Sequence, residues 1–216
     1  MSMFLPEILW IVCPYQCESL INIDVFLNMS SMEIITRNDI RILRPDEYHA
    51  LREGSKKLSN QIWLDAMLLT GMRYEELRRL QQYPSWFKGG YIDMPKGNGN
   101  KTKKYARQRE RTIHLSTMGK IILPIFLQGK VLPSRQSMDI NLKRWAWNVP
   151  MNDADISVKT FRKTWESWMV SSYPGMKAEI FLSQGHTEMI SLNHYLNIPF
   201  DDVDRLRMKP YVEGWY

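Results

Sequence analysis

Four separated stretches of the chain carry residue types suited to phosphate chemistry, and the first is an arginine placed after a glycine. Gly71 interrupts an apolar run, and Arg73 follows two residues later. A guanidinium just after a helix break can point into a cleft, where its planar fork matches two phosphate oxygens. Glu76, about one helical turn further on, would hold that fork in place. Taken alone, a surface arginine paired with a helical glutamate is the simpler interpretation.

The second stretch is a basic segment that carries the whole charge excess of the chain. Residues 96–111 hold seven basic residues and one acid, a balance equal to the formal net charge of +6 over all 216 residues. Such a segment suits the phosphate backbone of a nucleic acid, and Lys96 could give a proton to a leaving oxygen. A solvated basic loop is the alternative, and neighbouring lysines compete with Lys96 for the acid role. The other cations expected to bind nucleic acid are Lys101, Lys103, Lys104, Arg107, Arg109 and Arg111.

The third stretch pairs a lysine with an arginine near the start of a predicted helix. Lys159 and Arg162 are three residues apart, so a helix places both on one face. Together they could add two positive donors to a bound phosphate. The alternative is an ordinary amphipathic helix, because Phe161 and Trp165 need only a core to pack into.

The fourth stretch combines a histidine with a tyrosine that could act as a nucleophile. Gly185 permits a sharp turn that presents His186, and Tyr195 lies nine residues further along a predicted helix. A phenol can attack phosphorus when nearby positive charge offsets the developing negative charge. A buried histidine and a core tyrosine form the plainer alternative.

The sequence disfavours chemistry that depends on a metal or a nucleotide. The four histidines are scattered without an accompanying carboxylate cluster, which argues against a two-metal nuclease. There is no GxxxxGK[ST] motif, so ATP hydrolysis by a P-loop is also disfavoured. We therefore expect no metal and no cofactor.

The cysteine content and the N-terminus predict an intracellular protein without a membrane anchor. Cys13 and Cys17 make neither a zinc site nor a secreted disulfide scaffold, which favours a reducing compartment and a cytoplasmic location. The apolar segment at residues 4–12 is interrupted by Pro6 and Glu7 and is too short to span a bilayer. We expect neither a signal peptide nor a membrane span.

The periodicity predicts a mostly helical α+β fold, in which helices precede and follow one β-hairpin. Strands are expected at residues 91–94 and 111–115, joined across turn-forming residues 97–100. Asn60 is expected to cap the second helix, Gly71 and Gly185 to end helices, and Ser157 to cap a long one. Helices are expected at residues 44–58, 60–70, 73–81, 117–127, 137–149, 157–173, 177–183 and 187–196, and again from residue 201.

Taken in order, these residues resemble the signature of the tyrosine recombinase, or phage integrase, family. The family pattern is Arg, Lys, His-x-x-Arg, His or Trp, and then Tyr. The chain offers Arg73, a hairpin lysine, Lys159-x-x-Arg162, Gly185-His186 and Tyr195, and the likeness spans residues 44–214. Many members have histidine where this chain has Lys159. Members from archaeal viruses and plasmids often carry lysine there, and the segments at residues 182–187, 194–200 and 211–215 are similar to that group.

The resemblance implies a helical catalytic domain with a small β-hairpin that cuts and rejoins DNA without metal or ATP. Tyr195 would attack a phosphodiester and form a 3′-phosphotyrosyl link, as an integrase does when a viral or plasmid element is inserted or excised. Arg73, Lys159, Arg162 and His186 would stabilise the transition state, with Glu76 in support, and Lys96 would protonate the leaving 5′-hydroxyl. The alternative is a catalytically weak or inactive DNA-binding module of the same fold.

The resemblance also implies partners and a division of the chain. The expected partners are double-stranded DNA and further copies of the chain, assembled as a tetramer on DNA, with a monomer as the alternative in solution. Most members carry a separate core-binding domain before the catalytic one, and only about forty residues precede the matching region here. The expected division is an N-terminal arm of uncertain structure at 1–32, a catalytic domain at 33–200, and a C-terminal tail at 201–216 that docks on a neighbour or packs on its own protomer.

Overall fold

The elements follow the predicted order of helices, hairpin and helices in a computed structural model that describes residues 34–37, 39–97, 109–153, 155–185 and 200–215. This part is mostly helical with two small antiparallel sheets, which confirms the α+β class. The strands are β1 (Ile35–Arg37), β2 (Ile40–Ile42), β3 (Tyr91–Met94) and β4 (Arg111–His114). The helices are α3 (Pro45–Gly54), α4 (Leu58–Thr70), α5 (Tyr74–Gln82), α6 (Thr117–Gln128), α7 (Arg135–Trp147), α8 (Val158–Ser172), α9 (Lys177–Gln184) and α11 (Asp202–Val212), with 3-10 turns η1 (Pro84–Trp86) and η3 (Pro174–Met176).

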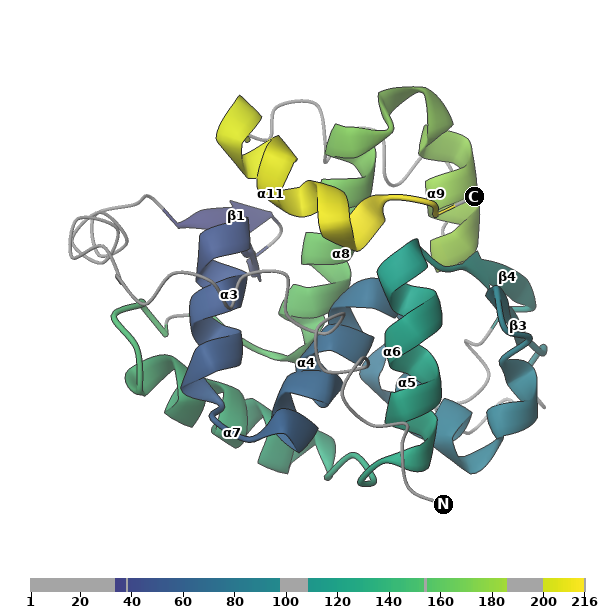
Figure 1. The fold of residues 1–216 in the computed structure, drawn as a ribbon, viewed down its shortest axis with the longest axis horizontal. Coiled ribbons are helices and arrows are strands. Elements are labelled where there is room, and N and C mark those ends of the chain that lie inside the picture. Colours follow the sequence, from purple (N-terminus) through teal and green to yellow (C-terminus); the bar gives the residue numbers. More distant parts are fainter. Residues whose placement is uncertain (1–33, 38, 98–108, 154, 186–199, 216) are drawn as a thin grey trace, which may run out of the picture. The chain divides into compact units, whose positions relative to one another are not determined.

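Helix α8 is the central element of residues 33–216, which form one compact unit. It packs against α4, α7, α9, α11 and β2, and it lies near the middle of the ribbon in Figure 1. Its buried side chains include Phe161, Trp165 and Trp168 on one face and Val170 on the opposite face. A helix that is buried on most of its sides belongs to a core. Residues carried by α8 are therefore held in a fixed place.

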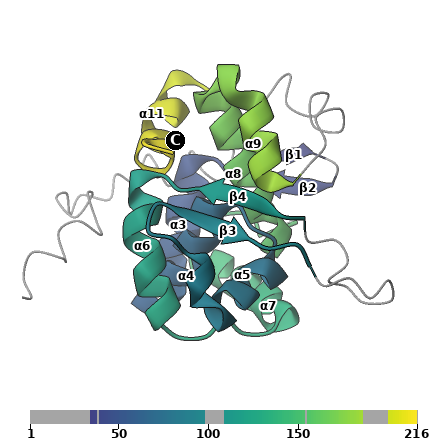
Figure 2. The ribbon, with the colours of Figure 1, turned by 90° about the vertical axis from the view of Figure 1, so that its right-hand side faces the viewer.

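The predicted hairpin is present, and its register decides where Arg111 lies. Strands β3 and β4 pair antiparallel, with Tyr91 opposite His114 and Met94 opposite Arg111. Ile92 and Ile113 are buried, as the alternation of a half-buried sheet requires. Figure 2 shows the hairpin with β4 next to α9, and these two elements are in contact. The pairing thus brings the first residue of β4 to the end of α9.

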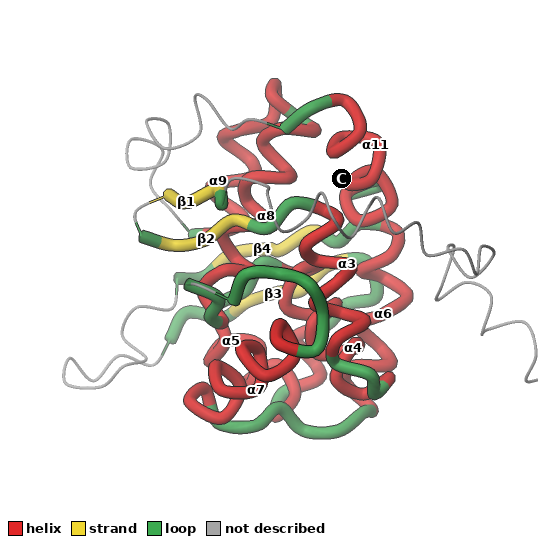
Figure 3. Tube along the Cα trace, turned by 90° about the vertical axis from the view of Figure 1, so that its left-hand side faces the viewer, coloured by secondary structure: helices red, strands yellow, loops and turns green. Residues whose placement is uncertain are grey.

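Two local predictions were wrong. Asn60 does not cap α4, because the helix already begins at Leu58 with Lys57 as its N-cap, and the Asn60 side chain donates to the carbonyl of Ser55 instead. Leu58 was expected within the first helix, which ends at Gly54. Strands β1 and β2 were not expected from the sequence; they pair with Ile35 opposite Ile42, and β2 packs against α8 (Figure 3).

The C-terminal helix packs on the chain to which it belongs. Helix α11 contacts α3, α6 and α8, and Trp215 is buried beyond its end. Arg44 forms an ion pair with Asp204, and Asp46 forms one with Arg207, so charged contacts join α11 to the start of α3. Docking of residues 201–216 on a neighbouring protomer stays a prediction. The expected N-terminal arm at 1–32 lies outside the described residues.

Within the described ranges, no helix combines the length and the apolar character needed to cross a membrane. Among the same residues, no three His, Cys, Asp or Glu side chains are grouped so that they could hold a metal ion.

Candidate active site

The site begins where α4 ends, because a left-handed glycine turns the chain and places Arg73 at the start of α5. Gly71 has φ +57°, and a Cβ built there would lie 2.5 Å from Nε2 of Gln184 and 2.6 Å from the ring of Trp165. A side chain at this position would be strained and would also clash. Arg73 then serves as the N-cap of α5, and 43% of its side chain is exposed.

Glu76 is the acceptor around which the site is built, and only 2% of its side chain is exposed. Its Oε2 accepts from the backbone N–H of Arg73 at 3.0 Å, and its Oε1 accepts from Nη1 of Arg73 at 3.0 Å. Burial alone would raise the pKa of the Glu76 carboxyl. The neighbouring Arg111, Arg73 and Arg162 outweigh that effect and lower the pKa to about 2. Glu76 is therefore ionised and holds Arg73 from two sides, as expected from the sequence.

Arg111 is a buried partner of Glu76, which corrects its expected place among the DNA-binding cations. Its Nη2 donates to Oε2 of Glu76 at 2.7 Å, its Nε donates to the carbonyl of Ser183 at 2.9 Å, and only 4% of the side chain is exposed. Its Nη1 also donates to the carbonyl of Arg109 at 3.2 Å. A guanidinium buried in this way presents little surface to a DNA backbone, and its departure would remove one of the two arginines that form ion pairs with the buried Glu76 carboxylate.

Arg162 arrives from α8 and bridges the ends of two other helices. Its Nη1 donates to the carbonyl of Gly71 at 3.1 Å, and its Nη2 donates to the carbonyl of Gln184 at 2.5 Å. Burial lowers the pKa of Arg162, and the positive charges of Arg73 and Arg111 lower it further, to about 9. Arg162 therefore lies in a position where added negative charge would be favourable.

The C-terminus of α9 explains why two guanidiniums gather there. The last carbonyls of a helix have no partner within the helix and carry its partial negative charge. Here the carbonyls of Ser183 and Gln184 accept from Arg111 and Arg162. Gly185 then ends the helix with φ +70°, and a Cβ built on it would lie 3.3 Å from Cδ of Arg111. The residue that precedes His186 therefore lies against the cluster.

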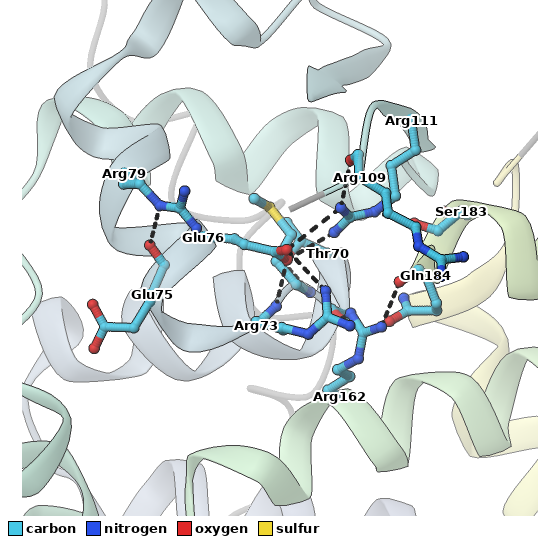
Figure 4. Close-up of polar contacts among 12 residues, drawn as sticks. Thr70, Arg73, Glu75, Glu76, Arg79, Arg109, Arg111, Arg162, Ser183 and Gln184 are labelled. Carbon is cyan, nitrogen blue, oxygen red and sulfur yellow. Dashed lines mark hydrogen bonds and ion pairs between the residues drawn. The ribbon is translucent and has the colours of Figure 1, made fainter. Parts of the chain in front are cut away.

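The arginine cluster, defined as Arg73, Arg111 and Arg162 around Glu76, can bind an anion. Figure 4 shows the three side chains pointing toward Glu76 from the N-cap of α5, from β4 and from α8. Three guanidiniums around one carboxylate leave an excess of two positive charges. Arg73 is the most exposed of the three, so it can present its fork to a phosphate while Glu76 and the helix ends hold the others. Cations fixed in advance stabilise charge that develops in a transition state.

The structure brings some of the predicted site residues together. Arg73, Glu76 and Arg162 meet in the cluster, although Arg162 lies far from the other two in the sequence. Lys96, two residues beyond β3, and Lys159, in the first turn of α8, are both exposed. Exposed Arg109 also lies near the cluster, because its Cβ is 3.8 Å from the Cβ position built at Gly185. The predicted residues outside the described part are Lys101, Lys103, Lys104, Arg107, His186 and Tyr195.

Two features of the site were missed from the sequence. One is the supporting role of Arg111, and the other is the use of the Ser183 and Gln184 carbonyls as anchors for arginines. A helix ending at Gly185 was a visible signal that free carbonyls would face the next segment. The partner of those carbonyls depends on the packing of β4 against α9, which no local pattern reveals.

Comparison of the chain with protein-family models, with curated proteins and with solved structures gave no match in any of the three.

Proposed function

We propose that this protein cuts and rejoins DNA strands through a covalent link between Tyr195 and a 3′-phosphate, as a site-specific recombinase or integrase of a mobile element. One observation carries the proposal. Arg73 and Arg162, which the sequence pattern assigns to the same phosphate, lie in one cluster around ionised Glu76. A chance match to a family pattern gives no reason for residues so far apart to share a site.

The proposed chemistry gives each residue of the site a distinct task. The phenol of Tyr195 loses its proton to solvent as its oxygen attacks phosphorus, the bond to the 5′-oxygen breaks, and Lys96 protonates that oxygen, which leaves as a 5′-hydroxyl. Arg73 and Arg162 bind the non-bridging oxygens, whose negative charge grows in the transition state. Glu76 orients Arg73. Lys159 and His186 complete the positive surroundings, and a 5′-hydroxyl from a partner strand reverses the reaction.

The proposed partner is double-stranded DNA, with four protomers assembled on two duplexes during recombination. The basic segment supports this partner even without Arg111, because residues 96–109 hold six cations and no acid, which favours a polyanion. Contacts of this kind position a protein on DNA without reading its sequence. A location on cytoplasmic DNA follows from the same proposal.

The test is capture of the covalent adduct on a suicide substrate. A pool of nicked duplexes with randomised sequence is incubated with the protein at low salt, and the products are separated on a denaturing gel. The wild-type protein is expected to give a band of protein-linked DNA that Tyr195→Phe abolishes. Arg73→Ala is expected to slow its formation on the order of 10²–10³-fold, the loss typical of one donor to a transition-state oxyanion.

The matched control is Arg78→Ala on the same helix. Arg78 pairs with exposed Glu75 at 3.2 Å, so its replacement removes an equal charge without touching the cluster. The adduct rate of this variant is expected to equal that of the wild type. DNA binding without an adduct, at every salt concentration, would leave only the inactive binding module.

A further inference from the structure

Gln184 carries a buried side-chain amide without a hydrogen-bond partner. The residue is 1% exposed, and neither its Nε2 nor its Oε1 has a partner within the described part of the chain. Leaving a buried polar group unpaired costs about 1–3 kcal/mol. An unpaired group in a native structure therefore requires a reason, and one recognised reason is a role in catalysis.

The amide lies against Gly71, whose carbonyl is one of the two that hold Arg162. Its Nε2 is 2.5 Å from the Cβ position built at Gly71, and the carbonyl of Gly71 accepts from Nη1 of Arg162 at 3.1 Å. The backbone carbonyl of Gln184 accepts from Nη2 of the same guanidinium at 2.5 Å. Figure 4 shows Gln184 beside Arg162 at the edge of the arginine cluster.

Packing alone does not explain an amide at this position. A methionine has similar length and would lie against Gly71 and Trp165 without leaving polar atoms unpaired. The charge of the cluster does favour a neutral donor. Burial, Arg73 and Arg111 already lower the pKa of Arg162 to about 9, and another cation would add to that repulsion. An amide N–H can donate to an anion without adding charge.

We propose that the Gln184 side-chain amide is a further donor to the scissile phosphate, turning from Gly71 toward a non-bridging oxygen bound by Arg73 and Arg162. This inference rests on the proposed function and adds a catalytic residue to it. The amide is unpaired without DNA and gains its partner as negative charge builds on the non-bridging oxygens. Interactions that strengthen in the transition state accelerate the chemical step.

The test measures the single-turnover rate of adduct formation at saturating DNA, together with the dissociation constant for DNA and the melting temperature. Gln184→Met keeps the shape and removes the N–H, whereas Gln184→Glu keeps an acceptor and adds negative charge. Gln184→Met is expected to melt at or above the wild-type temperature, to bind DNA equally well, and to react on the order of 10²-fold more slowly. Gln184→Glu is expected to react as slowly as Gln184→Met or more slowly.

Gln136→Met is the matched control, because it makes the same substitution at an exposed position on α7, which carries no residue of the arginine cluster. Its rate is expected to stay at the wild-type value. A wild-type rate in Gln184→Met overturns the inference, and so does a large fall in its melting temperature, which would assign the amide to folding. Failure of the wild-type protein to form any adduct overturns the proposed function, and this inference with it.

A modified substrate separates a direct contact from an indirect effect. A methylphosphonate at the scissile position replaces one non-bridging oxygen with a methyl group and removes an acceptor. With one of the two stereoisomers, Gln184→Met and the wild type are expected to react at equal rates, because the oxygen that Gln184 binds is gone. A rate ratio that is the same for both stereoisomers and for the unmodified phosphate would contradict a contact with phosphate.

Discussion

Replacement of Glu76 by glutamine is expected to destabilise the protein, because Glu76 is the only carboxylate among the described residues of the arginine cluster. The pKa of Glu76 falls from an ordinary 4.5 to about 2. At about 1.4 kcal/mol per pKa unit, this difference corresponds to about 3 kcal/mol of folding free energy. The value agrees with the roughly 3–5 kcal/mol by which removing one partner of a buried ion pair destabilises a protein. Glu76→Gln leaves Arg111 buried without its counter-charge.

The pH dependence of this destabilisation has a defined sign. A carboxyl whose pKa is lower in the folded state stabilises the protein above its unfolded pKa and loses that contribution as pH falls. The difference in unfolding free energy between wild type and Glu76→Gln should therefore be largest above about pH 4.5 and should decrease as the pH falls toward about 2. Urea unfolding at a series of pH values measures this gap.

The neighbouring Glu75 provides the control for this prediction. Its side chain is 49% exposed and pairs only with Arg78 in the described part. Exposed pairs contribute at most about 1 kcal/mol, so Glu75→Gln should lie close to the wild type at every pH. Equal stability of Glu76→Gln and the wild type at neutral pH would refute the role of Glu76 as the centre of the cluster.

Three further predictions concern Gly71, Arg111 and the lysines of the basic segment. Gly71→Ala should lower the free energy of unfolding in urea by more than about 2 kcal/mol, because it adds left-handed strain and a clash with Gln184. Gly175→Ala, with open space around it, should lower the free energy of unfolding far less, and equal effects of the two variants would contradict this reason. Arg111→Met should lower the unfolding free energy by about 3–5 kcal/mol, whereas Arg109→Met, at an exposed position, should change it by less than about 0.5 kcal/mol. A larger loss of stability in Arg109→Met than in Arg111→Met would return Arg111 to the DNA-binding surface. Replacing Lys101, Lys103 and Lys104 with glutamine should reduce the slope of log K against log salt by about 0.9 for each phosphate that is no longer neutralised, with the adduct rate at saturating DNA unchanged; an unchanged slope would exclude these lysines from the DNA interface.

The sequence predicted the parts of the site that depend on local chemistry. Gly71 and Gly185 end helices because glycine readily adopts positive φ, and both do so here. Arg73 and Glu76 are one turn apart, so their pairing needs only that α5 begin at the expected place. The hairpin followed from alternation and turn residues, and its strands form as expected.

The remaining features depend on packing between elements far apart in the chain. The partner of Arg111 is decided by the register of β4 and by the packing of that strand against α9, so the residue was assigned to DNA when it in fact holds Glu76. Strands β1 and β2 have three residues each, too few to show a period. Lys57 rather than Asn60 is the N-cap of α4. The residues of the whole first turn, and not one favourable capping residue, decide where a helix begins.

The central claim is that Tyr195 itself becomes joined to DNA, and mass spectrometry of the trapped adduct tests this most directly. The adduct is isolated from the nicked duplex, treated with nuclease and protease, and the modified peptide is sequenced. We predict a nucleoside 3′-phosphate esterified to the phenol oxygen of Tyr195 and to no other side chain. A nucleotide attached to a different residue, or cleaved DNA without any modified peptide, would contradict it.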